Sequence, residues 1–186
     1  RVSPEKFLLG EVWEDATTKY GFGHRRTYLL GKGLDSVMNY PFKNAVLDFV
    51  KGKPAEQAMT EILTICEHYP APALNTALNF LSTHDTERAL TVIADEPANG
   101  RGREWQSGRN VSGEAYEEGM LRLRMAYAII YTLPGVPCLY YGDEIGMQGY
   151  RDPFNRAFFR WDAHEQRLRP VLAQLAQLRH TCEAFR

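Results

Sequence analysis

Short apolar runs alternate with longer amphipathic segments along this chain. Four runs have the length of a buried strand and end in polar or small residues; they cover residues 7–9, 36–40, 77–81 and 138–141. Three segments carry apolar residues at helical spacing, which predicts helices over residues 54–69, 114–133 and 165–184. Pro54 suits the first turn of the first helix, and Pro134-Gly135 ends the second.

The apolar stripes of these helices are expected to face a core. Along the three helices in turn, the stripes consist of Met59, Ile62, Leu63 and Cys66; Leu121, Met125, Ile129 and Leu133; and Leu168, Leu172, Leu175 and Leu178. A brief helix is also predicted near Arg26–Leu30, and Pro41 is expected to close the second strand.

The order of the elements, strand then helix four times, predicts a parallel sheet with helices outside it. A doubly wound sheet and a barrel both satisfy this order. A complete (β/α)8 barrel has about 250 residues in eight units, and this chain of 186 residues offers four, so half a barrel fits. Two long polar stretches, residues 95–113 and 146–162, interrupt the pattern. Long connections of this kind are usually either functional or disordered.

Composition and charge narrow the class of protein. With 44% hydrophobic residues, 12% aromatic residues and a formal net charge of −1, the chain is typical of one globular domain. No basic excess points to nucleic acid, and no apolar run reaches the roughly 20 residues that span a bilayer. Cys66, Cys138 and Cys182 are odd in number and widely spaced, so neither a disulfide framework nor a thiolate zinc site is indicated.

Carboxylates gather just after three of the predicted strands. Glu11, Asp85, and Asp143 with Glu144 hold these positions. Active sites of parallel α/β proteins lie at the carboxyl ends of the strands, so these side chains are expected to share one mouth. Each taken alone is more often a solvated loop acid. Together they favour general acid–base catalysis by paired carboxylates, as in glycoside cleavage.

Other chemistries find little support. The chain has no GxSxG motif for a serine nucleophile. The chain has five histidines but no HExxH spacing, so no metal site is predicted. Gly21 and Gly23 form GxG without a preceding strand or the full dinucleotide fingerprint.

Five segments of the chain read as motifs: Gly10-Glu11-Val12-Trp13-Glu14-Asp15-Ala16, Asp35-Ser36-Val37-Met38-Asn39-Tyr40-Pro41-Phe42, Ser82-Thr83-His84-Asp85-Thr86-Glu87-Arg88, the stretch 133–144, and Asp152-Pro153-Phe154-Asn155-Arg156. In this order they resemble motifs of the α-amylase superfamily (glycoside hydrolase family 13), in its cyclomaltodextrinase, neopullulanase and maltogenic amylase branch. The resemblance covers nearly the whole chain. Five motifs together are far more specific than Gly-Glu or His-Asp alone.

The resemblance implies an α/β fold in which residues 1–186 form the C-terminal half of a (β/α)8 TIM barrel, strands five to eight with their helices. It implies retaining cleavage of α-1,4 and sometimes α-1,6 glucosidic bonds in malto-oligosaccharides, cyclodextrins or related α-glucans. In the family the nucleophile is an aspartate at the end of strand four, which lies outside this chain, as does the β-domain that follows the barrel. The chain alone is therefore expected to be an inactive fragment that pairs with its missing N-terminal half or with a copy of itself.

Carried over residue by residue, the motifs assign the central chemistry. Glu11 becomes the general acid/base, which must carry a proton at the start of the reaction. Asp85 becomes the third carboxylate, which holds sugar hydroxyls and favours developing positive charge, and His84 donates a hydrogen bond to the same sugar. Thr83 departs slightly from relatives that carry Ser or Asn at this position.

Further roles are implied around these residues. Asp152 and Arg156 would bind the next glucose on the non-reducing side, and Trp13 would offer an apolar face to a sugar on the leaving-group side, unless it only packs at the barrel mouth. Asp143 and Glu144 are expected to brace loops and arginines. Tyr40 and Arg88 are weaker candidates for lining the cleft.

No organic cofactor is implied. The resemblance allows calcium in the parent protein, with ligands outside this chain, and a cytoplasmic setting suits the cyclomaltodextrinase branch. The competing hypothesis is a non-catalytic relative that uses the amylase fold as a carbohydrate-binding or interaction module. The joint presence of Glu11, His84, Asp85, Asp152 and Arg156 argues against it, because a degenerate copy would be free to lose some of them.

Overall fold

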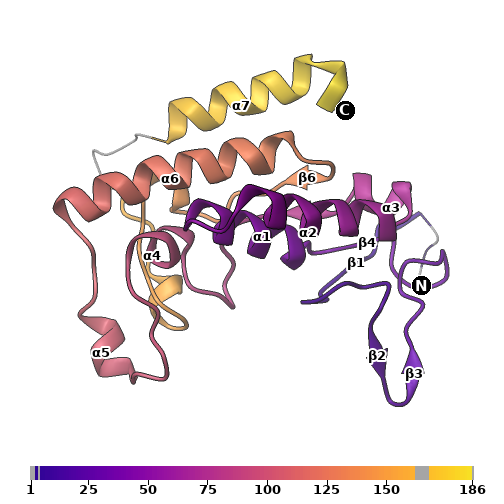
Figure 1. Cartoon of the computed structure of the whole chain (residues 1–186), viewed down its shortest axis with the longest axis horizontal. Helices are drawn as coiled ribbons and strands as arrows, with labels where there is room; N and C mark the ends of the chain where they lie inside the picture. The colour runs from indigo at the N-terminus through magenta and orange to yellow at the C-terminus, as the bar shows by residue number, and fades with distance from the viewer. Residues whose placement is uncertain (1–2, 4, 162–167, 186) are drawn as a thin grey trace.

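Four short parallel strands run side by side in chain order in this structure, a computed structural model that describes residues 3, 5–161 and 168–185 (Figure 1). They are β1 (Leu9–Gly10), β4 (Ser36–Val37), β5 (Leu78–Asn79) and β6 (Val136–Pro137). β1 pairs with β4 and β5 pairs with β6, and a single parallel bridge between Met38 and Leu78 joins the two pairs. Parallel neighbours in chain order are what repeated βα units produce.

Three of the four strands overlap the predicted runs, but the position predicted for the fourth is wrong. β6 lies at Val136–Pro137, just before the expected residues 138–141. Pro137 cannot donate a backbone hydrogen bond, yet the strand is at the edge of the described sheet, where proline is tolerated. The donors to β5 come from the flanking residues: the amides of Val136 and Cys138 bond the carbonyls of Ala77 and Asn79 at 2.7 and 2.6 Å.

The helix predicted near Arg26–Leu30 is also wrong. A hairpin of β2 (Tyr20–Gly21) and β3 (His24–Arg25) occupies the start of this connection, and turns follow it. Both residues of its two-residue loop, Phe22 and Gly23, have positive φ, as a tight hairpin turn of this kind requires. The glycine meets that requirement without strain, so the pair at positions 21 and 23 reflects a turn and no dinucleotide loop.

Helix α1 (Tyr40–Val50) begins directly after β4, where only the end of a strand was expected. Asn39 caps it, because its Oδ1 accepts the backbone N–H of Phe42 at 3.2 Å. Pro41 therefore sits in the first turn of a helix, a position that needs no amide hydrogen.

The remaining helices follow the predicted order. The predictions over 54–69 and 114–133 are confirmed, and the described part of 165–184 is helical from residue 169 to 181. Between β4 and β5 lie α2 (Ala55–His68) and α3 (Ala71–Asn75); between β5 and β6 lie α4 (Ala89–Ala94), α5 (Arg103–Ser107) and α6 (Gly113–Thr132); after β6 come the short 3-10 helices η1 (Asp143–Ile145) and η2 (Phe154–Arg156), then α7 (Arg169–Thr181) and η3 (Glu183–Phe185).

The predicted core stripes are only partly right. Met59 and Leu63 of α2 and Leu121 and Met125 of α6 are exposed, Leu121 by 66%. Leu178 of α7 is exposed as well. The predictions for Ile62, Leu168 and Leu172 are confirmed, since all three are buried. Four other predicted residues pack partly buried against the core: Cys66, Ile129, Leu133 and Leu175. The core also receives residues outside the predicted stripes: Ala58 and Ile65 from α2, and Met120, Leu123, Tyr127 and Ile130 from α6. The helical period is predicted correctly, but the face of each helix that is buried depends on the element against which that helix packs.

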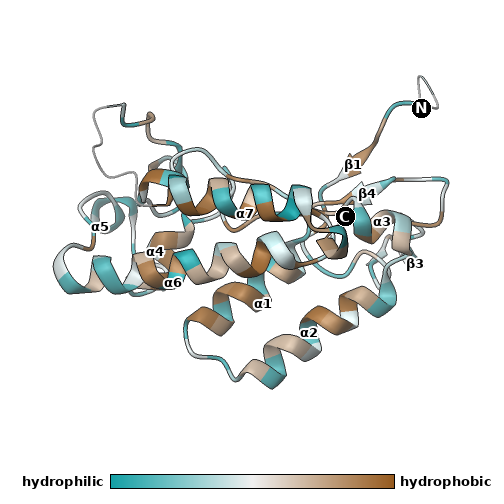
Figure 2. Ribbon diagram, turned by 90° about the horizontal axis from the view of Figure 1, so that it is seen from above, coloured by the Kyte–Doolittle hydropathy of each residue, from teal (hydrophilic) through white to brown (hydrophobic). Residues whose placement is uncertain are grey.

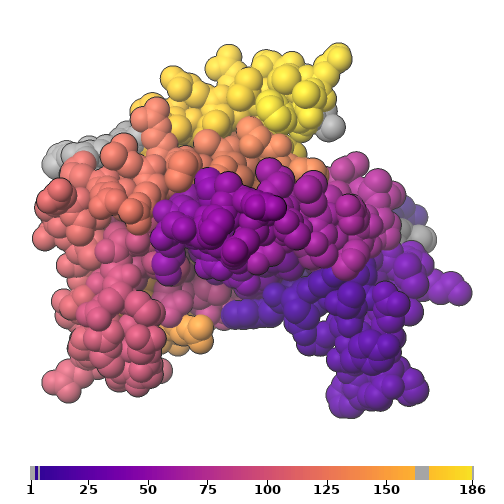
Figure 3. Space-filling view, viewed as in Figure 1, coloured from indigo at the N-terminus to yellow at the C-terminus, as the bar shows by residue number. Residues whose placement is uncertain are grey.

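Helix α6 lies at the centre of the helical layer and contacts α1, α4 and α7. α7 packs on its outer side, and α1 and α2 pack together beside it (Figure 2). The hairpin and the α5 segment project from the body at its two ends (Figure 3). The strands and helices thus form a layered α/β body from which the loops after the strands extend.

Candidate active site

Glu11 follows the last residue of β1 and stands in a small aromatic cluster. Its Oε1 accepts the indole N–H of Trp13 at 2.8 Å and the hydroxyl of Tyr40 at 3.3 Å. The Trp13 ring stacks on the Tyr40 ring, with centroids 4.4 Å apart and planes 12° from parallel. Two donors and a stacked pair of rings therefore fix one oxygen of this exposed carboxylate.

Tyr40 is the residue that connects this cluster to the core. Its ring is buried and packs edge-on against Phe80, with centroids 4.9 Å apart. Burial raises the pKa of the Tyr40 hydroxyl to about 12, and the negative charges of Glu11 and Asp85 add to the rise, while a hydrogen bond with Thr83 opposes it. The phenol therefore keeps its proton at neutral pH and acts as a donor to Glu11.

His84 and Asp85 lie on the loop that follows β5. The carboxylate of Asp85 lies 3.1 Å from Nε2 of His84 and 3.4 Å from Nη2 of Arg156. The backbone N–H of Asp85 donates to Oγ1 of Thr83 at 3.2 Å, which tightens the turn. The hydroxyl of Thr83 thus serves as the hydrogen-bond acceptor in this turn.

Asp152 and Arg156 come from the loop after β6 and join the same cluster. Nε of Arg156 lies 3.0 Å from Oδ1 of Asp152 and donates to the carbonyl of His84, also at 3.0 Å. Asp152, Arg156 and the histidine–aspartate pair are therefore neighbours, although some 70 residues separate them in sequence.

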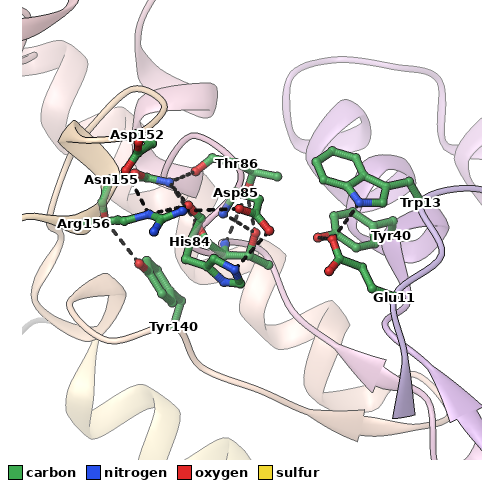
Figure 4. Close-up of polar contacts among 11 residues, drawn as sticks. Glu11, Trp13, Tyr40, His84, Asp85, Thr86, Tyr140, Asp152, Asn155 and Arg156 are labelled. Atoms are coloured by element: carbon green, nitrogen blue, oxygen red, sulfur yellow. Dashed lines mark hydrogen bonds and ion pairs between the residues drawn. The ribbon is translucent and has the colours of Figure 1, made fainter.

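The predicted site residues form two groups that face each other (Figure 4). Glu11 and Trp13 make one group with Tyr40; His84, Asp85, Asp152 and Arg156 make the other, and the carboxylates of Glu11 and Asp85 are on the facing sides. Trp13 is 46% exposed, but one of its faces is covered by Tyr40. The arrangement turns the carboxylates of Glu11 and Asp85 toward each other, with Arg156 beside Asp85.

The bracing role predicted for Asp143 and Glu144 is confirmed. The buried carboxylate of Asp143 accepts hydrogen bonds from Ser82 and Tyr127, each at 2.6 Å, and from Arg88 at 3.2 Å. Glu144 accepts the backbone N–H of Gly142 at 2.7 Å. Burial raises the pKa of Asp143 to about 6, although these three donors favour its charged form.

Arg88 does not line the cleft, contrary to the weaker of the sequence expectations. Its side chain is 0% exposed. It donates to the carbonyl of Tyr141 at 2.7 Å, and its guanidinium carbon lies 4.9 Å from the ring centres of Tyr140 and Tyr141. Arg88 thus links the segment that follows β5 to the segment that follows β6.

The described residues contain neither a candidate metal-ion cluster nor a candidate membrane-spanning helix. Within the described residues, no three His, Cys, Asp or Glu side chains are grouped as a metal ion would require. In the same residues, no helix combines the length and the apolar character needed to cross a bilayer.

A Tyr40→Phe substitution tests the link between the aromatic cluster and Glu11. It keeps the stacking on Trp13 and removes one donor to Glu11. If Glu11 serves in the glucan cleavage that the motifs imply, that cleavage should fall by about 5- to 10-fold, a loss of roughly 1 kcal/mol. Circular dichroism melting should show a much smaller change. Unaltered cleavage would mean that the hydroxyl does not support the carboxylate.

Comparison with known proteins agrees with the motifs. The family model for the α-amylase catalytic domain matches residues 1–180. The chain is 33% identical to an amylopullulanase of Thermoanaerobacter thermohydrosulfuricus over 96% of its length, and 30% identical to a cyclomaltodextrinase of Geobacillus thermopakistaniensis over 100%. It superposes on a cyclic α-maltosyl-(1→6)-maltose hydrolase of Arthrobacter globiformis with a TM-score of 0.76, 25% identity and 100% of this chain covered.

The chain spans only part of each of these proteins: 12% of the amylopullulanase, 27% of the cyclomaltodextrinase and 36% of the A. globiformis hydrolase. These relatives are glycosidases, and membership of their family implies the (β/α)8 barrel fold. On this match over nearly its whole length, the chain belongs to the α-amylase family and to its catalytic domain.

Proposed function

We propose that this chain is units five to eight of a (β/α)8 barrel that cleaves α-1,4, and in some substrates α-1,6, glucosidic bonds of malto-oligosaccharides and cyclodextrins with retention. Glu11 is the general acid/base and Asp85 the third carboxylate. The nucleophilic carboxylate comes from the other half of the barrel. The chain alone is inactive.

The observation that carries this proposal is the facing placement of the two carboxylates. Glu11 and Asp85 follow two different parallel strands, yet their carboxylates lie on the facing sides of the two groups (Figure 4). Arg156 and His84 hold Asp85 from the other side. Glycoside cleavage pairs a proton-donating carboxyl group with a nucleophilic carboxylate. Glu11 is the first of these, the second comes from the other half of the barrel, and Asp85 assists the transition state.

The geometry supports distinct roles for the two oxygens of Glu11. Within the described residues, both hydrogen bonds to this carboxylate end on Oε1. Oε2 is therefore the oxygen that carries the proton. It passes this proton to the glycosidic oxygen as the bond to the anomeric carbon breaks and the nucleophile bonds to that carbon. The ionised Glu11 then takes a proton from the water that releases the sugar.

The open edges of the sheet support the need for a second half. β1 and β6 are the edge strands of the described sheet, and Leu9 and Val136 on them are exposed. Exposed apolar edge strands invite pairing with further strands. A half-barrel carrying strands one to four would cover both edges and complete the substrate site.

Reducing-sugar release from cyclodextrin tests the proposal. The purified chain is assayed alone and after refolding with the N-terminal half of the barrel from the full-length protein. Cleavage only by the mixture is the expected result and places the nucleophile in the added half. Cleavage by the chain alone would contradict the assignment of Asp85. A mixture that binds maltotriose without cleaving it would instead favour the carbohydrate-binding alternative.

A further inference from the structure

Asn155 is the only η2 residue that is completely buried, with 0% of its surface exposed. Its side-chain nitrogen Nδ2 lies 3.3 Å from the carbonyl oxygen of Thr83, 2.8 Å from that of His84 and 2.8 Å from that of Thr86. Three carbonyls of the loop after β5 thus converge on one amide group. An amide nitrogen has two hydrogens, so two of the three carbonyls share one of them.

This contact reaches the residues that carry Asp85. The carbonyl of His84 also accepts Nε of Arg156 at 3.0 Å, so two consecutive residues of η2 hold it, one from the buried side and one from the exposed side. Arg156 in turn touches the Asp85 carboxylate. The position of Asp85 therefore depends on η2 through its backbone as well as through its side chain.

The contact with the three carbonyls requires a hydrogen-bond donor at position 155. Among the described residues, Oδ1 of Asn155 is buried without a hydrogen-bond partner. A buried, unsatisfied carbonyl costs about 1–3 kcal/mol, and rotating the amide would place this oxygen against three carbonyl oxygens. Ala would offer no donor, and the carboxylate of Asp would face three oxygens that are themselves partly negative. The position thus needs two N–H groups, at the expense of an unpaired oxygen.

We propose that Asn155 is a positioning residue for the reaction, which clamps the His84–Asp85 turn to the loop that bears Asp152 and Arg156. The clamp sets the distance between the carboxylate that stabilises the transition state and the residues that bind the neighbouring sugar. This inference rests on the proposed function for its catalytic consequence but not for its structural one.

The test compares Asn155→Ala with Asn79→Ala in the assembled barrel. Asn79 is an equally buried asparagine whose Nδ2 donates to the carbonyl of Pro134 at 2.6 Å and whose Oδ1 accepts from Asn39 at 3.0 Å, so neither bond goes to residues 83–87. Asn155→Ala should lower kcat on cyclodextrin by about 10- to 100-fold, because displacement of a catalytic group by about 1 Å has effects of this size. KM should change by less than about 3-fold.

Hydrogen exchange provides a second readout that does not depend on activity. In Asn155→Ala the amides of residues 83–87 should exchange at least about 10-fold faster, while those of α6 keep their rates. Asn155→Asp, which has the same shape, should behave like the alanine variant at pH 7.5. It should recover part of its activity relative to wild type as acidification gives the carboxyl a proton to donate.

Unchanged exchange at residues 83–87 would overturn the proposal. So would an equal fall in kcat for Asn79→Ala, because the loss would then reflect general destabilisation. If the wild-type assembly cleaves no glucan, the proposed function fails, and the exchange rates alone decide whether Asn155 clamps the turn.

Discussion

Replacing Glu11 with Gln should lower cyclodextrin cleavage by the assembled barrel by about 10²- to 10⁴-fold, the usual contribution of a general acid–base group. The glutamine would keep the volume of the side chain and an oxygen for the Trp13 and Tyr40 donors. It would have no proton to give the glycosidic oxygen. Steady-state kinetics measure the loss, and maltotriose binding by calorimetry should stay close to that of the wild type.

The substrate can separate the acid role from a structural one. With α-maltosyl fluoride the leaving group needs no proton, so the first step of the Glu11→Gln variant should recover most of its rate. Glu14→Gln is the matched control. Glu14 lies three residues away and its carboxylate pairs with Lys19, so its variant should cleave at the wild-type rate. A Glu11→Gln variant equally slow on the fluoride would contradict the acid–base assignment.

Arg88→Met should lower the free energy of unfolding of the chain by about 3–5 kcal/mol, the usual cost of removing one partner from a buried ion pair. Arg88 and Asp143 are both buried, with Nη1 and Oδ1 3.2 Å apart. Met fills a similar volume but leaves the Asp143 carboxylate without its cation. Urea unfolding followed by circular dichroism measures the effect.

The experiment belongs at pH 7.5. The pKa of Asp143 in the folded chain is about 6, above its ordinary value of 3.8. The folded state therefore binds this proton more tightly, and this group makes the fold less stable as pH rises from about 4 to about 6. Above that window the carboxylate is charged and the ion pair is complete.

A double-variant cycle distinguishes a paired charge from simple packing. If the two groups stabilise each other, Arg88→Met combined with Asp143→Asn should cost at least about 1 kcal/mol less than the sum of the single variants. Arg122→Met is a suitable control, because Arg122 pairs with Glu118 on the exposed face of α6 and its loss should cost under about 1 kcal/mol. Additive losses at Arg88 and Asp143 would contradict the ion-pair interpretation.

From the sequence, only those site residues that lie in short, recognisable motifs could be predicted. Glu11, His84, Asp85, Asp152 and Arg156 each stand within a recognisable motif. Asn155 lies between two of them without a predicted role, because nothing in the sequence around a buried amide indicates which carbonyls it will meet. Arg88 is a weaker candidate for the cleft from its motif, but it is buried. Its burial depends on Asp143, 55 residues further along the chain.

The sequence by itself determined the α/β class, the order of the main strands and helices, and the family. These follow from local periodicity and from motifs, both of which are properties of neighbouring residues. It did not determine which face of each helix is buried. Met59 and Leu121 share the helical period of the core residues beside them, yet they are exposed.

Only the tertiary structure decided which face of each helix is buried, the burial of Arg88 and the clamp at Asn155. Each depends on contacts between residues far apart in the chain: Asn155 with His84, Arg88 with Asp143, and α6 with α1, α4 and α7. The hairpin at residues 20–25 and the start of α1 rest on nearby residues, since Tyr20 pairs with Arg25 and Asn39 caps the helix at Phe42, but the sequence pattern did not predict them. Burial and hydrogen-bond satisfaction are properties of the whole packed arrangement, so residues with the same local pattern come to lie in the core or in solvent according to which elements meet them.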